Sequence, residues 1–193
     1  MVDYTSTMRG TVHNDPMQKG LYDLIEWCNT RMKVDSIVEI GAFAGQSSVI
    51  FASLLSKVYV IDPFIGGYDN DDTASNALLK DRLAVKRAFK KNTIGYQNIK
   101  LYELYDVHAV DYFPLRSVHI VYIDADHLYD SLCKQISRWI PRIVSGGFIS
   151  GHDYRLPEES IFPKQHASVV KAVNETVGCP DARFCDGSWV KQI

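Results

Sequence analysis

Two stretches of the chain carry side chains that can bind a metal ion or accept a proton. Asp124, Asp126 and His127 follow one apolar run, and His152 and Asp153 follow the next. Carboxylates and water suit Mg²⁺, whereas a histidine ligand favours Mn²⁺ or Fe²⁺. An imidazole titrates near neutral pH, so His127 or His152 could accept a proton from a substrate hydroxyl. We therefore take these two histidines as the candidate catalytic residues.

The metal-binding interpretation has a simpler alternative, in which His127 lies on the first turn of a helix and only one of the carboxylates binds a ligand. Asp126 precedes a predicted helix, where an aspartate commonly caps the first turn and binds no metal. We expect the metal ligands to be Asp124, His152 and Asp153.

A third stretch, residues 37–48, has the composition of a nucleoside-binding turn. It joins a β-branched apolar run to a helical pattern through two glycines. Glycine permits a tight turn and leaves no Cβ between the backbone and a ligand, and the N–H groups and dipole of a helix N-terminus converge there. The candidate cofactor-binding residues in this turn are Glu39, Gly41, Ala42, Gly45, Gln46 and Ser47.

The turn departs from two better-known nucleotide motifs. A phosphate-binding loop would end in Gly-Lys-Ser or Gly-Lys-Thr, whereas this turn has Gly45-Gln46-Ser47. A dinucleotide fingerprint would need G-x-G-x-x-G, which is absent and argues against a nicotinamide-dependent oxidoreductase. A glycine turn that binds nothing remains the plain structural alternative.

The second predicted strand ends in another acid. Asp62 follows residues 58–61, about 20 residues after the glycine turn, which is where a carboxylate can accept hydrogen bonds from ribose hydroxyls. The alternative is a carboxylate that only caps the strand end or its turn.

Alternating strand and helix patterns must position these residues. Strands are predicted at 37–40, 58–62, 99–102, 118–124 and 148–151, and helices near 16–32, 47–55, 74–91, 107–113, 128–140 and 169–177. Residues 182–185 and 188–193 then predict a hairpin around a two-residue Asp186-Gly187 turn. The pattern predicts an α/β fold: a doubly wound, mostly parallel, Rossmann-like sheet closed by a C-terminal antiparallel hairpin. In such a sheet the carboxyl ends of the strands share one crevice, where the candidate residues should meet.

Length and charge limit the function classes. The 193 residues predict a single domain spanning 1–193, with 1–14 a tail or a flap over the site. A net charge of −2 gives no reason to expect nucleic acid as a partner, and no apolar run reaches the roughly 18–20 residues of a membrane span. The start of the chain lacks the pattern of a secretory signal, so we expect a cytoplasmic protein.

The remaining segments carry weaker signals. The four cysteines have no metal-type spacing and predict reduced thiols, with a Cys179–Cys185 disulfide as the less favoured alternative. The acidic loop 63–72 is expected to be a solvated loop and helix cap. Residues 155–166 are a candidate lid over the site.

Taken together, these motifs resemble class I S-adenosylmethionine-dependent methyltransferases. The first motif is Glu39-x-Gly41-x-x-x-Gly45, and later ones are Asp124-Ala125-Asp126-His127 and Gly151-His152-Asp153-Tyr154. The resemblance spans roughly residues 35–193. Within this class, the chain most resembles the metal-dependent sugar O-methyltransferases of macrolide biosynthesis and, more distantly, the catechol and caffeoyl-coenzyme A O-methyltransferases.

The resemblance implies roles for individual residues. Asp124 matches a metal ligand of the catechol-type enzymes, whereas His152-Asp153 stands where they have Asp-Asn, so the metal itself is open. His127 matches the proposed general base of the sugar enzymes. Tyr105 or Asp106 would face the adenine of S-adenosylmethionine, and Asp124 is expected to be a cofactor-binding residue as well as a metal ligand. A divalent metal, Mg²⁺ or Mn²⁺, and a small hydroxylated acceptor such as a sugar complete the expectation.

Three alternatives stay open beside this one. A methyltransferase could work by histidine chemistry without a metal. A binding module could keep the nucleoside pocket without turnover, or a homo-oligomer could complete the site with a second subunit. The nicotinamide-dependent oxidoreductase is the remaining enzyme class.

Overall fold

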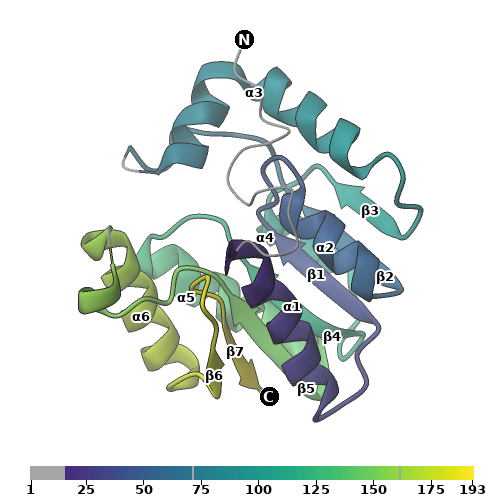
Figure 1. Cartoon of the computed structure of the whole chain (residues 1–193), viewed down its shortest axis with the longest axis vertical. Helices are drawn as coiled ribbons and strands as arrows, with labels where there is room; N and C mark the ends of the chain where they lie inside the picture. The colour runs from purple at the N-terminus through teal and green to yellow at the C-terminus, as the bar shows by residue number, and fades with distance from the viewer. Residues whose placement is uncertain (1–15, 71, 161) are drawn as a thin grey trace.

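The computed structural model describes residues 16–70, 72–160 and 162–193 (Figure 1). The helices and strands run in the order α1 (Pro16–Asn29), β1 (Ser36–Ile40), α2 (Gln46–Leu54), β2 (Lys57–Ile61), α3 (Thr73–Thr93), β3 (Ile99–Tyr102), α4 (Asp106–Ala109), η1 (Val110–Tyr112), β4 (Val118–Ile123), α5 (Tyr129–Trp139), η2 (Ile140–Arg142), β5 (Ile143–Gly151), η3 (Pro157–Glu159), α6 (Pro163–Val177), β6 (Ala182–Arg183) and β7 (Trp189–Gln192). The three η elements are short 3-10 helices. The expected tail or flap at residues 1–14 lies outside the described residues.

The strands form one seven-stranded sheet in the order β3-β2-β1-β4-β5-β7-β6. Strands β1 to β5 are parallel, and β7 runs antiparallel to both β5 and β6. The strand order reverses between β1 and β4, and a ligand crevice is expected beyond the carboxyl ends of the strands at such a point. The predicted parallel sheet with a closing hairpin is confirmed.

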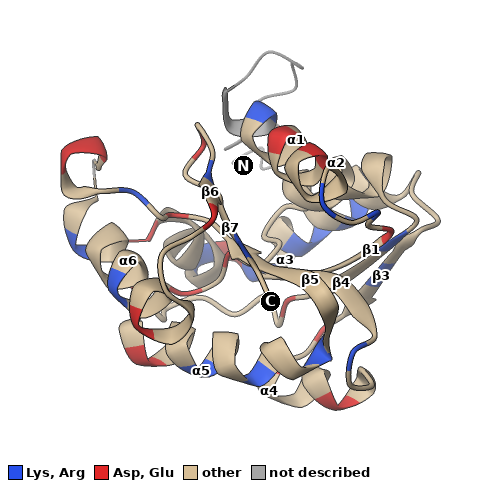
Figure 2. Ribbon diagram, turned by 90° about the horizontal axis from the view of Figure 1, so that it is seen from below, with Lys and Arg blue, Asp and Glu red and all other residues tan. Residues whose placement is uncertain are grey.

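Helices cover both faces of the sheet because successive side chains of a buried strand point to opposite faces. Ile37 packs in one core cluster with apolar residues of α1, α2 and α3, whereas its neighbour Val38 packs in a second cluster with residues of α4, α5 and α6. Figure 2 shows the sheet nearly edge-on, with α1 and α2 on one side and α4 and α5 on the other. This two-sided packing confirms the doubly wound architecture.

The last parallel strand is longer than predicted. A strand was predicted only at 148–151, because Ser145-Gly146-Gly147 before it is typical of a turn, but β5 runs from Ile143 to Gly151. Val118 pairs with Ile143 and Ile120 pairs with Phe148, so a bulge absorbs the extra residues. The sequence signal of a turn here marks an irregularity inside the strand.

The hairpin turn also differs from its prediction. The Phe184 N–H donates to the Ser188 carbonyl at 2.9 Å, and the Gly187 N–H donates to the Phe184 carbonyl at 3.0 Å. These bonds enclose a three-residue loop with Gly187 at φ 94°, which is a glycine bulge following a tight turn. Asp186 is buried, and its carboxylate accepts a hydrogen bond from the Ser188 N–H at 2.9 Å. This side-chain bond stabilises the three-residue loop in place of the predicted two-residue turn.

Two smaller expectations are also settled by the structure. All four cysteines lie within the described residues, and none of them forms a disulfide. Asp72 caps α3, with its carboxylate accepting the N–H groups of Ala74 and Ser75 at 2.9 and 3.0 Å. None of the helices in the described ranges is long and apolar enough to span a lipid bilayer.

Candidate active site

A cavity of about 560 Å³ opens at the carboxyl ends of the parallel strands. Its walls come from the turns after β1, β2, β3, β4 and β5 and from the start of α6, and its size is that of a small-molecule site. The predicted residues that line it are Gly41, Ala42, Gln46, Ser47, Asp62, Tyr105, Asp106, Asp124, His127, His152 and Asp153. Glu39 and Gly45, also predicted as cofactor-binding residues, are not among its lining residues.

Gly41 is required by the packing of the turn against β4. Its φ is 84°, and a Cβ added there would lie 2.0 Å from the carbonyl oxygen of Asp124. Gly45 also has a positive φ, of 80°, and a Cβ there would lie 2.8 Å from the Phe89 ring on α3. The two glycines therefore let the turn pack closely against its neighbours, and only Gly41 faces the cavity.

Glu39 supports the helix that follows the turn and does not face the cavity, contrary to the prediction. Its side chain is fully buried within β1, and its two carboxylate oxygens accept hydrogen bonds from the hydroxyls of Ser47 and Ser48. A buried carboxylate is tolerated when such donors satisfy it. Glu39 thereby joins β1 to the first turn of α2.

Asp62 organises the same turn from the end of β2. Its carboxylate accepts the N–H groups of Ala42 and Phe43, both at 2.9 Å, and of Phe64 at 2.7 Å. Burial raises the pKa of Asp62, although these three bonds oppose the shift. An ionised carboxylate offers about four acceptor positions. Asp62 therefore holds the turn and keeps one acceptor position beyond these three bonds.

The turn after β3 contributes two predicted residues. Tyr105 is half exposed at the cavity, and Asp106 begins α4 with its carboxylate paired to Arg138 of α5. This ion pair neutralises Asp106 and anchors α4 against α5. Ser131 and Gln135 of α5 line the same part of the cavity, although the sequence patterns assigned them only to a helix.

The predicted metal ligands come together. Ligand atoms of Asp124, His152 and Asp153 all lie within 4.8 Å of one another, and the three side chains are partly buried. Two carboxylates and one imidazole suit a divalent cation such as Mn²⁺ or Fe²⁺, and Mg²⁺ if the histidine stays outside its shell. The residues present therefore fit the expected metal.

Asp126 adopts the simpler of its two predicted roles. Its carboxylate accepts the Leu128 N–H at 3.1 Å and the Ser131 hydroxyl at 2.6 Å, at the start of α5. The side chain therefore stabilises the helix start beside the cavity.

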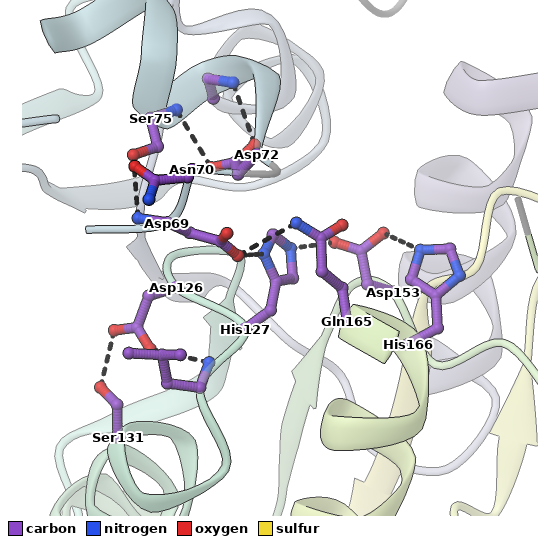
Figure 3. A network of polar contacts seen from close by, with 12 residues as sticks. Asp69, Asn70, Asp72, Ser75, Asp126, His127, Ser131, Asp153, Gln165 and His166 are labelled. Carbon is purple, nitrogen blue, oxygen red and sulfur yellow. Dashed lines mark hydrogen bonds and ion pairs between the residues drawn. The ribbon is translucent and has the colours of Figure 1, made fainter. Parts of the chain in front are cut away.

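Asp153 is surrounded by imidazoles (Figure 3). One carboxylate oxygen lies 2.7 Å from His127 Nε2, and the other lies 3.0 Å from His152 Nδ1 and 3.4 Å from His166 Nε2. Burial by itself would raise the pKa of Asp153, but the three imidazoles hold it well below its usual range. Asp153 therefore stays ionised at neutral pH.

The same contact changes the state of His127. Burial by itself would lower the pKa of His127, but the hydrogen bond to Asp153 and the charges of Asp153 and Asp124 raise it to about 9. The imidazole is therefore protonated at neutral pH in the ion-free protein and cannot accept a proton there. Its predicted role as a base requires that the charge of Asp153 be countered.

Besides Ser131 and Gln135, the sequence analysis missed three polar residues around His127 and Asp153. Asp69 belongs to the loop expected to be solvated, but its side chain is only 13% exposed and lies 3.8 Å from His127. Gln165 and His166 come from the start of α6, at the end of the candidate lid, and line the cavity. The only signal for Gln165 and His166 was the position of residues 155–166 after β5, because no motif includes them.

The cavity has a strongly acidic lining. Six aspartates line it, and no lysine or arginine is among the lining residues that the structure describes. The aspartates are Asp62, Asp72, Asp106, Asp124, Asp126 and Asp153. Such a cavity favours cationic groups and disfavours anionic ones.

The comparisons with known proteins agree with this fold. No curated protein sequence matches the chain significantly. The cofactor-bound protein Rv0187 from MTB superposes with a TM-score of 0.62 at 12% identity, covering 97% of this chain and 84% of that one. The O-methyltransferase NovP superposes with a TM-score of 0.59 at 17% identity, and the match covers 91% of this chain and 77% of NovP. CalS11, a TDP-rhamnose 3'-O-methyltransferase of calicheamicin biosynthesis, superposes with a TM-score of 0.56 at 17% identity, and the match covers 91% of this chain and 78% of CalS11.

At these identities the three structures support the fold. A family model described as a methyltransferase domain matches residues 38–154, which is more than half of the chain and reaches from β1 to just past β5. The matched segment contains the glycine turn, Asp62, Asp124, His127 and Asp153. The chain therefore belongs to the methyltransferase domain family and has the class I fold of S-adenosylmethionine-dependent methyltransferases.

Proposed function

We propose that this protein is an S-adenosylmethionine-dependent O-methyltransferase that acts, with the help of a divalent metal, on a small hydroxylated molecule such as a sugar. The observation that carries the proposal is the convergence of Asp124, His152, Asp153 and His127 on the cavity that the glycine turn borders. A metal-ligand group and an imidazole beside a nucleoside-type turn match the needs of methyl transfer to a hydroxyl.

The glycine turn and Asp62 would hold the nucleoside part of S-adenosylmethionine. Gly41, Ala42, Gln46 and Ser47 line the cavity at the turn, and Asp62 keeps an acceptor position for a ribose hydroxyl. The acidic lining also favours the positive charge of the sulfonium. Tyr105 would border the adenine on the other side.

Asp124, His152 and Asp153 would hold the metal. A bound divalent cation would fix the acceptor oxygen and favour its deprotonation. The adjacent carboxylates keep this corner negative, which suits a cation.

The transfer is a displacement at the methyl carbon. The acceptor oxygen forms a bond to that carbon while the carbon–sulfur bond breaks, and the electron pair stays on the sulfur as a neutral thioether. His127 Nε2, which lies beside the metal-ligand group, would take the hydroxyl proton. Alignment of the two reactants in one cavity can supply roughly 7–11 kcal/mol of the barrier reduction.

The acceptor is proposed to be uncharged or cationic. NovP and CalS11 are named as O-methyltransferases, and the acceptor named for CalS11 carries a diphosphate. A phosphate in the present cavity would meet aspartates with no arginine or lysine among the described lining residues to bind it. A hydroxylated acceptor without phosphate or carboxylate fits this lining better.

The proposal is tested first by cofactor binding. Calorimetry should detect S-adenosylmethionine and S-adenosylhomocysteine binding, and the absence of both at millimolar concentration would refute it. A radiolabelled methyl group should then transfer to members of an acceptor panel: methyl glucoside, glucosamine, glucose 6-phosphate and 4-methylcatechol. Binding of S-adenosylmethionine without methyl transfer to any acceptor of the panel would favour the binding module instead.

The metal requirement is tested separately. Activity that a chelator removes and Mg²⁺ or Mn²⁺ restores would support metal assistance. Activity that persists in the chelator and in Asp124→Asn would select the metal-independent alternative.

A further inference from the structure

A line of polar contacts crosses the cavity and begins and ends on the first turns of α6 (Figure 3). Gln165 donates its amide N–H to Asp69 Oδ2 at 3.0 Å, and the same oxygen lies 3.8 Å from His127 Nδ1. On the other side of the ring, His127 Nε2 contacts Asp153, which in turn contacts His166. The imidazole of His127 therefore lies between two carboxylates, Asp69 and Asp153.

Asp69 lies near His127 but does not form a hydrogen bond with it. His127 Nδ1 is buried and has no hydrogen-bond partner, and 3.8 Å to Asp69 is too long for a hydrogen bond. Catalytic hydrogen bonds are often long in ligand-free enzymes and shorten when the substrate complex forms. An inward movement of about 1 Å by the Asp69 carboxylate would complete this bond.

The position of Asp69 is set by elements on both sides of the cavity. Its backbone N–H donates to the Ser75 hydroxyl at 3.1 Å, which ties the loop to the first turn of α3. Its carboxylate is held by Gln165, which is 96 residues away in the sequence. The carboxylate is thus held on the Nδ1 side of His127, 3.8 Å from that nitrogen.

We propose that Asp69 is a positioning residue for His127 and that Gln165 holds Asp69 in place. A neutral imidazole donates from one nitrogen and accepts at the other. Asp153 lies 2.7 Å from Nε2, so Nε2 becomes an acceptor only when a bound cation takes the charge of Asp153. A carboxylate at Nδ1 then fixes the Nδ1–H tautomer and leaves Nε2 to accept the proton, as the buried aspartate does in serine hydrolases. Nε2 is the atom that faces Asp153 and the metal-ligand group. This inference rests on the proposed methyl transfer, in which His127 takes the acceptor proton.

The variants Asp69→Asn and Gln165→Ala test the inference. The asparagine can present its own N–H to Nδ1, which selects the Nε2–H tautomer and removes the proton-accepting atom. The matched control is Asp35→Asn, because Asp35 lies 3.0 Å from His119 Nδ1 just before β1, at the far end of the sheet from the cavity. The Asp35→Asn substitution likewise replaces a carboxylate beside a histidine Nδ1, but at a position away from the cavity.

Two measurements read the result. Proton–nitrogen correlation spectra of the imidazoles, in protein loaded with Mg²⁺ and S-adenosylhomocysteine at a pH where His127 is neutral, report its tautomer. Methyl transfer is measured with whichever acceptor of the panel the wild-type enzyme methylates fastest, together with the calorimetric Kd of S-adenosylhomocysteine.

The wild type should show the Nδ1–H tautomer, and Asp69→Asn should shift it to Nε2–H. We expect kcat to fall on the order of 10²-fold in Asp69→Asn, the usual contribution of a general base, with the Kd of S-adenosylhomocysteine unchanged within about twofold. Gln165→Ala should lower kcat by roughly tenfold. Asp35→Asn should behave as wild type.

An unchanged His127 tautomer in Asp69→Asn would overturn the inference. The inference would also be overturned if, in Asp69→Asn, the Kd of S-adenosylhomocysteine rose by the same factor as kcat fell. Asp69 would then only maintain the structure of the cofactor site. A wild-type protein that transfers no methyl group refutes the proposed function instead, and the tautomer measurement distinguishes the two failures.

Discussion

Removing the charge of Asp153 should both destabilise the metal-free protein and return His127 to a neutral imidazole at physiological pH. The pKa of His127 is raised from its ordinary value of 6.5 to about 9, against the opposing effect of burial, chiefly by its hydrogen bond to Asp153. Both side chains are well buried, at 14% and 18% exposed. Solvent screening therefore weakens their interaction little.

The size of the effect follows from the pKa. A rise from 6.5 to about 9 corresponds to about 3 kcal/mol of stabilisation of the folded protein. The removal of one partner from a buried ion pair costs about 3–5 kcal/mol, which agrees. For a chain of this size, 3 kcal/mol should lower the melting temperature by about 6–12 °C.

The dependence on pH has a definite sign. Because the folded pKa of His127 is raised, its contribution is fully present below pH 6.5 and is lost as the pH rises to about 9. Because the folded pKa of Asp153 is lowered, the same interaction is present above its ordinary 3.8 and is lost as the pH falls through its lowered value. The difference between wild type and Asp153→Asn should therefore be largest between about pH 4 and 6.5.

The assay combines imidazole NMR titration with thermal unfolding in a chelator. His127 should titrate near pH 9 in the wild type and at or below 6.5 in Asp153→Asn, where burial acts without the carboxylate. A wild-type His127 that titrates near 6.5, or a melting temperature that is the same in both proteins at pH 6, would refute the reasoning.

Three further perturbations test other parts of the site. Asp124→Asn should weaken Mn²⁺ binding on the order of tenfold or more, measured by calorimetry, while S-adenosylhomocysteine still binds; equal metal affinity would contradict the ligand assignment. Gly41→Ala should lower the free energy of unfolding by about 2 kcal/mol or more, because the added Cβ meets the Asp124 carbonyl, whereas Gly95→Ala, with open space around it, should change it by less than about 0.5 kcal/mol in the same denaturant titration. Glu39→Gln should cost about 1–3 kcal/mol by that method, since a buried serine hydroxyl loses a charged acceptor; a stability equal to wild type would show that the buried carboxylate is dispensable.

The fold was largely predictable from local patterns. The buried run around Ile37 and Val38 is apolar on both faces, which is typical of a parallel strand covered on both sides. The errors fell where glycines mark more than one kind of structure. Gly146 lies in a bulge inside β5, and Gly187 ends a three-residue loop, because pairing with neighbouring strands decided between structures that the local sequence allows equally.

The site was only partly predictable. Asp124, His152 and Asp153 follow strands, so the geometry of a parallel sheet was enough to predict that they meet. The direction of a side chain is a different matter. The Glu39 carboxylate accepts hydrogen bonds from two serines and does not line the cavity. The Asp62 carboxylate accepts hydrogen bonds from three backbone N–H groups.

The order of residues along the chain determined the parallel sheet and the edge of the sheet at which Asp124, His152 and Asp153, which could hold a metal ion, come together. The contacts of His127 with Asp69 and Asp153 were decided only by the tertiary structure, as were those of Gln165 and His166 with these two carboxylates. The physical reason is that hydrogen bonding and charge act through space. The strand pattern can bring such residues to one edge of the sheet, but it does not fix which side chains there form hydrogen bonds and ion pairs with one another.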